Sequence, residues 1–98
     1  MKIPKSVTIL GRKFTVKVVS KEVIEKEIGV GVMGGMNYTR KSIMISNNMS
    51  KEDMYITYLH EVCHVGMYVA GLNQVIPLEM QEILCETLAN TFFDVNKK

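Results

Sequence analysis

The sequence predicts an α+β fold, in which a small, twisted, mainly antiparallel sheet packs on two helices. Alternation of apolar and polar residues dominates the first half of the chain, and helical periodicity with end signals dominates the second half. The 98 residues are 47% apolar, which is enough for one hydrophobic core. Neither a linker nor an internal repeat interrupts them, so residues 1–98 are predicted to form a single domain.

Strand-like alternation appears first in residues 6–10 and 14–20. Gly11 and Arg12 lie between these segments and are the expected tight turn of a hairpin. Residues 41–46, with the sequence KSIMIS, are short and mostly apolar, which predicts a further strand. If that strand is a sheet edge, an extended peptide could pair with it.

Two segments between these strands allow two interpretations each. Residues 21–28 fit either a short helix or a continuation of the preceding strand. Residues 29–38 are rich in glycine and fit either a loop that leads into a strand or a glycine-interrupted strand. They lack the lysine and the strand–turn–helix frame of a phosphate-binding loop, so no such loop is expected there.

Two helices are expected in the second half of the chain. Ser50, followed by Asp53, resembles a capping box, and Gly71 supplies a stop, so the first helix should span residues 51–70. Pro77 suits the first turn of the second helix, whose C-terminal end is followed by lysines. That helix carries a mostly apolar stripe, which we expect to pack on the first helix: Met80, Ile83, Leu84, Leu88, Thr91, Phe92 and Val95.

Charge and composition exclude several classes of protein. The net charge is +2 without a basic run, so no nucleic-acid partner is expected. No segment approaches 18 apolar residues, and the N-terminus lacks the apolar stretch of a signal peptide, so no membrane association and a cytoplasmic location are expected. Cys63 and Cys85 are too few for a disulfide scaffold and lack zinc-site spacing, which predicts reduced core residues.

The first helix contains the motif His-Glu-x-x-His, formed by His60, Glu61 and His64. Residues four apart share one helix face, so both imidazoles can reach one ion at about 2.0–2.1 Å. Glu61 is rotated by about 100° from His60, which places it badly as a ligand of that ion. Its carboxylate could instead reach a metal-bound water, so the motif predicts two ligands and one general base.

A zinc site of this kind needs a further protein ligand, and the chain has no third histidine. The second helix offers Glu79, Glu82 and Glu86 on one face, although such a row is commonly a solvated surface. An antiparallel return from Pro77 puts Glu86 about 13.5 Å along the helix, close to the height of the histidines, and Glu82 only about 7.5 Å along it. This favours Glu86, with Glu82 as the alternative ligand or as an outer partner of an imidazole N–H; Asn90 is another candidate for such a partner.

The segments YLHEVCHVGMYVAGL and LCETLANTFF resemble small phage and mobile-element zincin-like metallopeptidases of the ImmA/IrrE-like group. Members of that group carry His-Glu-x-x-His on one helix and a glutamate, in a pattern close to Glu-x-x-Ala-[Asn/Asp]-x-Phe, on a later helix. The resemblance is strongest over residues 42–93 and implies that Glu86 is the ligand glutamate, as in gluzincin-type sites. It also implies a zincin-like fold.

We therefore expect a zinc-dependent metallopeptidase that acts on a peptide or protein substrate, with Zn²⁺ as cofactor and Glu61 as catalytic base. The alternative is a non-enzymatic zinc-containing phage accessory module that keeps the fold and binds through its surface. An oxyanion-stabilising donor is also expected, and no single residue stands out among the four tyrosines: Tyr38, Tyr55, Tyr58 and Tyr68.

Overall fold

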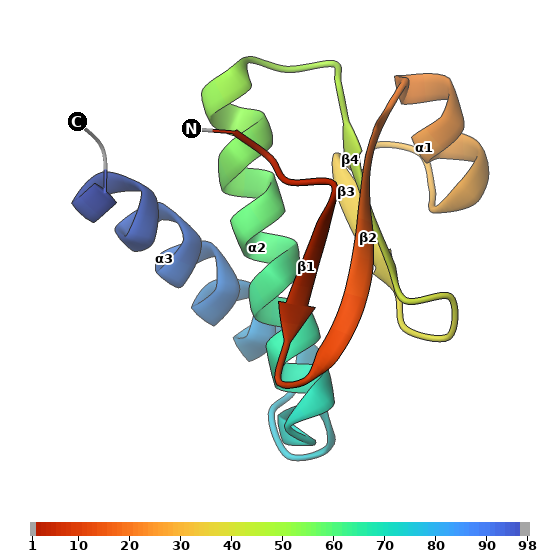
Figure 1. The fold of residues 1–98 in the computed structure, drawn as a ribbon. Coiled ribbons are helices and arrows are strands. Elements are labelled where there is room, and N and C mark those ends of the chain that lie inside the picture. Colours follow the sequence, from red (N-terminus) through yellow and green to blue (C-terminus); the bar gives the residue numbers. More distant parts are fainter. Residues whose placement is uncertain (1, 97–98) are drawn as a thin grey trace.

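The computed structural model describes residues 2–96, so Lys97 and Lys98, expected to follow the last helix, lie outside the described part. Figure 1 shows an α+β arrangement, as predicted, with a sheet on one side of a long helix and a second long helix on its other side. The elements in chain order are β1 (Ser6–Ile9), β2 (Arg12–Val19), α1 (Lys21–Glu27), β3 (Gly34–Asn37), β4 (Ser42–Ser46), α2 (Lys51–Val69), a short 3₁₀ helix η1 (Leu72–Gln74) and α3 (Leu78–Asn96).

The four strands form a mixed sheet in the order β1-β2-β4-β3. β1 and β3 run antiparallel to their neighbours, whereas β2 and β4 are parallel. A parallel pair requires a crossover connection, and residues between β2 and β4, including α1, supply it. The suggestion that residues 41–46 form a sheet edge is therefore wrong, because β4 is interior and β3 is the edge strand.

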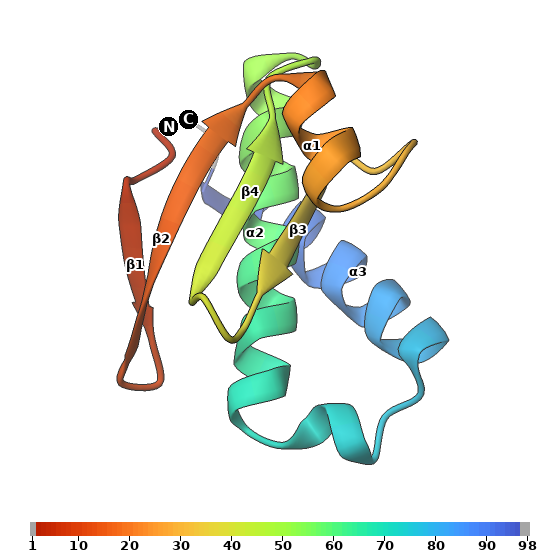
Figure 2. The same cartoon turned by 90° about the vertical axis from the view of Figure 1, so that its right-hand side faces the viewer.

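Residues 21–28 allowed two interpretations from the sequence. They begin with a helix, because a cap at its start and a buried side chain favour one. The Ser20 hydroxyl accepts a hydrogen bond from the Val23 backbone N–H at 3.3 Å, as an N-cap does. Ile24 is fully buried, so the helix has an anchor in the protein interior. Figure 2 shows α1 on the side of the sheet opposite α2.

The hairpin between β1 and β2 turns one residue earlier than expected. Ile9 pairs with Arg12, so Leu10 and Gly11 form the turn and Arg12 belongs to β2. Both turn residues have positive φ, 49° and 85°, as a two-residue turn matched to the strand twist requires. Leucine at such a position is unusual, and the sequence gives no signal for it.

The main core lies between the sheet and α2. It consists of buried side chains from three strands and one helix: Ile9, Phe14, Val16, Ile43, Ile45, Tyr58 and Val65. Burying each large apolar side chain contributes about 1.5–3 kcal/mol. This packing fixes α2 against the sheet, and with it the helix face that carries the two histidines.

The ends of the long helices follow the sequence signals. The Ser50 hydroxyl accepts a hydrogen bond from the Asp53 N–H at 3.1 Å, which confirms Ser50 as the N-cap of α2. Gly71 follows the last turn with φ of 81°, a conformation that glycine adopts without strain. α3 begins directly after Pro77, whose carbonyl accepts the first helical hydrogen bond, from Gln81 at 3.0 Å.

The apolar stripe predicted to pack α3 on α2 does not do so. The buried residues of α3 are instead Gln81, Cys85, Ala89 and Phe93. Cys85 and Ala89 are small, which allows the two helices to approach closely. The apolar residues of the stripe remain exposed, with fractions from 37% for Leu84 to 74% for Val95. Within residues 2–96, no helix combines the length and apolar character that crossing a bilayer needs.

Gly34 is the point where the edge strand β3 comes closest to α2. A Cβ added there would lie 2.7 Å from the Thr57 Cγ2 methyl and 3.2 Å from the Met44 carbonyl oxygen. It would also lie 3.6 Å from Cγ of Glu61. Glycine therefore lets the edge strand run directly beside the motif of α2.

We predict that Gly34→Ala lowers the free energy of unfolding by about 1–3 kcal/mol, because the added methyl group overpacks the contact with Thr57. The measurement is urea unfolding followed by circular dichroism. Thr57→Ser removes the clashing methyl group and is the matched partner, so the double variant should recover part of the loss. If Gly34→Ala destabilises the Thr57→Ser variant as much as it destabilises the wild type, this explanation is wrong.

Candidate metal centre

His60 and His64 lie one turn apart on the side of α2 that faces α3. Their ring centroids are 4.8 Å apart, and their Nε2 atoms are 3.2 Å apart. Each side chain is 16% exposed, so both rings are partly shielded but reachable from solvent. The spacing of the motif therefore brings two imidazole nitrogens to one point, as the sequence predicts.

Glu82 of α3 supplies an oxygen to the same point. Its Oε1 lies 3.0 Å from Nε2 of His60 and is also in contact with Nε2 of His64. Ligand atoms of these three residues all lie within 4.8 Å of one another. A tetrahedral ion with ligand bonds of about 2.0–2.1 Å separates its ligand atoms by about 3.3 Å. The distances of 3.2 Å between the two Nε2 atoms and 3.0 Å from Glu82 to His60 are close to that separation, so these three residues could hold a metal ion.

Glu86 occupies a different position from the one expected of it. Its Oε1 lies 2.9 Å from Nδ1 of His60, the ring nitrogen that points away from His64. The expected roles of the two glutamates are thus exchanged. Glu82 contacts Nε2 of both histidines, and Glu86 contacts Nδ1 of His60. The comparison of distances along the two helices takes them to be antiparallel and to start side by side. In the structure, α3 instead crosses α2 at a wide angle after the loop containing η1 (Figure 2).

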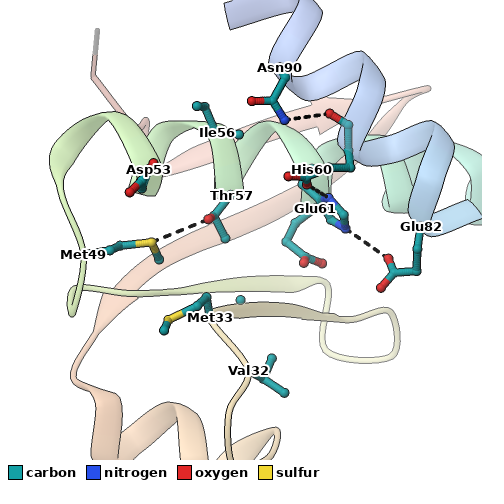
Figure 3. Close-up of a pocket in the computed structure, with 12 residues that line it drawn as sticks. Val32, Met33, Met49, Asp53, Ile56, Thr57, His60, Glu61, Glu82 and Asn90 are labelled. Atoms are coloured by element: carbon teal, nitrogen blue, oxygen red, sulfur yellow. Dashed lines mark hydrogen bonds and ion pairs between the residues drawn. The ribbon is translucent and has the colours of Figure 1, made fainter.

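Glu61 lies beside the cluster without joining it. Its side chain extends from α2 toward the segment of Met33 and Gly34 (Figure 3). It is only 8% exposed. Burial raises the pKa of Glu61; the neighbouring His60 and His64 act in the opposite direction, and the charge of Glu82 adds to the rise. A carboxylate with a raised pKa is suited to exchanging protons near neutral pH.

The pKa of Glu82 moves in the opposite direction. Its partial burial favours a higher pKa, but hydrogen bonds and charge interactions with His64 and His60 outweigh this and lower the pKa of Glu82. Glu82 therefore stays ionised, as a metal ligand must. Two nearby carboxyl groups whose pKa values are pushed apart indicate two different roles.

His60, Glu61, Glu82 and Glu86 form one wall of an open cleft of about 580 Å³ between α2, α3 and the segment leading into β3 (Figure 3). That volume falls within the range of small-molecule and peptide sites. Away from the histidine the lining mixes the apolar side chains of Val32, Met33, Met49 and Ile56 with the polar side chains of Asp53 and Thr57 (Figure 3).

Some cleft residues were not identified from the sequence. Thr57 lies one turn before Glu61, so helical periodicity could have indicated it; its hydroxyl donates to Sδ of Met49 at 3.6 Å. Met33 and Gly34 reach the cleft only through strand pairing, which leaves no local signal. Asn90 lines the cleft, but its amide donates to the Glu86 backbone carbonyl at 2.9 Å and not to a histidine.

The four tyrosines lie elsewhere. Tyr58 is buried in the main core, and its ring is 5.7 Å from that of Tyr55. Tyr38 and Tyr68 pack on each other with ring centroids 4.3 Å apart. None of the four is among the residues that line the cleft, so an oxyanion-stabilising tyrosine has no support from the geometry.

Comparison with protein-family models, curated proteins and solved structures finds no significant match to this chain. The chemical interpretation of the cluster therefore depends on its own residues and their geometry.

We predict that Glu61→Gln raises the melting temperature of the metal-free protein at pH 7. The folded state raises the pKa of Glu61, so ionising this residue opposes folding, and glutamine removes that cost. The advantage should be complete above the raised pKa and should vanish below the unfolded value of about 4.3, where glutamate is also neutral. Thermal unfolding between pH 4 and 8 measures it. Glu27→Gln, on the exposed end of α1, is the control, and an equal shift in both variants would contradict the prediction.

The roles of the two α3 glutamates give a second prediction. Glu82→Gln should weaken zinc binding more than Glu86→Gln, because Glu82 reaches both Nε2 atoms and Glu86 only Nδ1 of His60. Loss of the Glu86 carboxylate as the partner of His60 Nδ1 should still weaken zinc binding by about 10–100-fold. Competition with a chelator of known affinity measures both variants, with Glu79→Gln as control on the same helix. A larger loss for Glu86→Gln would return the ligand role to Glu86.

Proposed function

We propose that the chain is a zinc-dependent peptidase. The observation that carries the proposal is the convergence of His60, His64 and Glu82 on one point, next to a buried carboxylate at the wall of a cleft. When bound, zinc lowers the pKa of a coordinated water toward neutrality and polarises a carbonyl. The two cysteines are unpaired, which accords with action in the reducing cytoplasm.

Glu61 is the general base in this proposal. It accepts a proton from the attacking water, and its raised pKa allows it to return the proton to the leaving amine. Its position on α2, rotated away from both imidazole nitrogens, keeps it free for this exchange. The low pKa of Glu82 keeps that carboxylate from competing for the proton.

Glu86 orients His60. With its Nδ1 proton donated to the Glu86 carboxylate at 2.9 Å, His60 has a lone pair on Nε2, the atom that faces His64 and Glu82. A carboxylate on the outer nitrogen of a ligating imidazole fixes the tautomer and raises ligand basicity. Glu86 is thus a positioning residue for the zinc ligand.

The edge strand supports a peptide substrate. β3 pairs with β4 on one side only, and its first residue, Gly34, lines the cleft beside Glu61. An extended peptide can add to such an edge through backbone hydrogen bonds. Its side chains would meet the apolar Met33, Met49 and Ile56 together with the polar Asp53 and Thr57.

The second candidate function is a zinc-containing binding module without catalytic activity. The exposed apolar side chains of α3 favour it, since large apolar surfaces commonly mark interaction sites. The retained, buried Glu61 distinguishes the two candidates, because a purely structural zinc site needs no proton acceptor.

Glu61→Gln should keep zinc bound and reduce peptide cleavage by about 10²–10⁴-fold, because glutamine cannot accept the proton of the attacking water. A peptide-library cleavage assay on wild type and variant, each with measured zinc content, tests this. Glu27→Gln is the activity control, since Glu27 lies on α1 outside the cleft. Equal cleavage by wild type and Glu61→Gln would exclude the mechanism, and no cleavage by zinc-loaded wild type would favour the binding module.

A further inference from the structure

The cleft beside the candidate metal centre is acidic, although the chain as a whole is not. Its lining includes the carboxyl groups of Asp53, Glu61, Glu82 and Glu86, and among the described residues that line it there is no lysine or arginine. The chain carries a net charge of +2, so this acidity is local. A bound zinc ion would add two positive charges and leave the cleft negative even if one carboxyl group were protonated. A cleft lined by one sign of charge attracts ligands of the opposite sign.

Asp53 is the carboxyl group of this cleft that the metal centre does not use. Glu82 and Glu86 contact imidazole nitrogens, whereas the Asp53 carboxylate forms no hydrogen bond or ion pair within residues 2–96. The backbone N–H of Asp53 donates to the Ser50 hydroxyl, which leaves the side chain free. Figure 3 shows Asp53 at the end of the cleft away from Glu82. Its charge is therefore available to a ligand that lies along the cleft.

The helix end alone does not explain the position of Asp53. Glu52 and Asp53 both lie in the first turn of α2, where negative charge suits the positive end of the helix dipole. Of the two, only Asp53 lines the cleft. The helix end thus accounts for an acidic residue in this turn but not for its place in the cleft, and Glu52 provides a matched comparison.

Glu61 gives an independent indication that the cleft takes a positively charged ligand. Its side chain is only 8% exposed, lines the same cleft, and accepts no hydrogen bond within the described part of the chain. A carboxylate removed from water without a partner is costly, and positive charge in the cleft lowers that cost. The two histidines, or a zinc ion on them, supply such charge on one side of Glu61. On the side of Asp53 the described lining supplies none.

The length of the cleft fits a long basic side chain of an extended peptide. Asp53 precedes His60 by seven residues, which is about 10.5 Å along the helix. An extended peptide advances about 3.3 Å per residue, so a peptide with one carbonyl at the metal centre brings a residue two or three positions away beside Asp53. Met33, Met49 and Ile56 add apolar surface, which suits the methylene stem of lysine or arginine while the charged head reaches Asp53.

We propose that the cleft selects peptides with lysine or arginine two or three residues from the cleaved bond, and that the Asp53 carboxylate binds this side chain. The location of the cleaved bond rests on the proposed peptidase function, whereas binding of the basic side chain by Asp53 does not require turnover. The α-amino group of a peptide carries the same charge, but it has no methylene stem to cover the apolar wall. The favoured ligand is therefore a basic side chain within a peptide.

Calorimetric titration with short acetylated peptide amides tests the selection without cleavage. The peptides consist of alanine, leucine and serine, with lysine, glutamine or glutamate at one central position. They are titrated into zinc-loaded Glu61→Gln protein, which should not turn them over. We expect the lysine peptide to bind about 2–5-fold more tightly than the glutamine peptide and about 10-fold more tightly than the glutamate peptide, as for partly exposed ion pairs. The difference should shrink as the salt concentration rises.

Substitutions at position 53 of the same Glu61→Gln protein identify the residue responsible. Asp53→Asn should remove most of the preference for lysine, and Asp53→Lys should reverse it in favour of glutamate. Glu52→Gln removes the neighbouring charge outside the cleft and should leave the preference unchanged. Circular dichroism reports whether each variant is folded. A lysine peptide that binds no better than the glutamine peptide, or a preference for lysine that the folded Asp53→Lys protein retains, would overturn the proposal.

Product analysis with zinc-loaded wild type locates the cleaved bond relative to the lysine. Cleavage two or three residues from the lysine supports the proposal. Cleavage at positions unrelated to the lysine, or only of peptides with a free α-amino group, would contradict it. Preferential binding of the lysine peptide without any cleavage would contradict the peptidase function and still support Asp53 as the group that binds a basic side chain.

Discussion

The close packing of α3 on α2 is the interaction on which the candidate site depends. It is made through small or slender side chains, Cys85 and Ala89, which are almost completely buried. Only a short distance between the helix axes lets glutamate side chains of α3 reach histidines of α2. A larger residue at either position would move Glu82 away from the two Nε2 atoms, so the spacing of the metal ligands is set by residues that are not ligands.

The same contact would make a bound metal ion part of the fold. α3 is held by α2 on one side, and its other apolar residues remain exposed. A zinc ion joined to His60, His64 and Glu82 would link the two helices directly, and its binding energy would stabilise the folded state. Burial raises the pKa of Cys85 to about 12, so in the metal-free protein this thiol, which lies on the contact between the helices, stays protonated.

Local rules predicted much of this structure, and contacts between distant segments account for what they missed. The cap at Ser50, the stop at Gly71 and the convergence of His60 and His64 depend on residues within a few positions of one another, and the structure confirms them. The pairing partners of β4 and the crossing of α3 over α2 depend on the whole chain. Hence the sequence could not tell that β4 is interior.

The wrong prediction that the apolar stripe of α3 packs on α2 has the same origin. Helical periodicity identifies an apolar face but not what covers it, and here the smaller residues Cys85 and Ala89 face α2 while the larger ones remain exposed. The choice between Glu82 and Glu86 also depended on a crossing angle that no periodicity encodes. The opposite pKa shifts of Glu61 and Glu82 add what spacing alone could not: Glu82 is suited to stay charged, and Glu61 is suited to exchange protons.

The most direct test of the central claim is zinc-edge X-ray absorption on protein loaded with one equivalent of Zn²⁺ per chain. A centre built from His60, His64 and an α3 glutamate should show only nitrogen and oxygen ligands, at about 2.0–2.1 Å, with the multiple-scattering signature of two imidazoles. Sulfur at about 2.3 Å would instead indicate ligation by Cys63 or Cys85. That result, or a failure of the chain to take up one equivalent of zinc at neutral pH, would contradict a centre built from His60, His64 and an α3 glutamate.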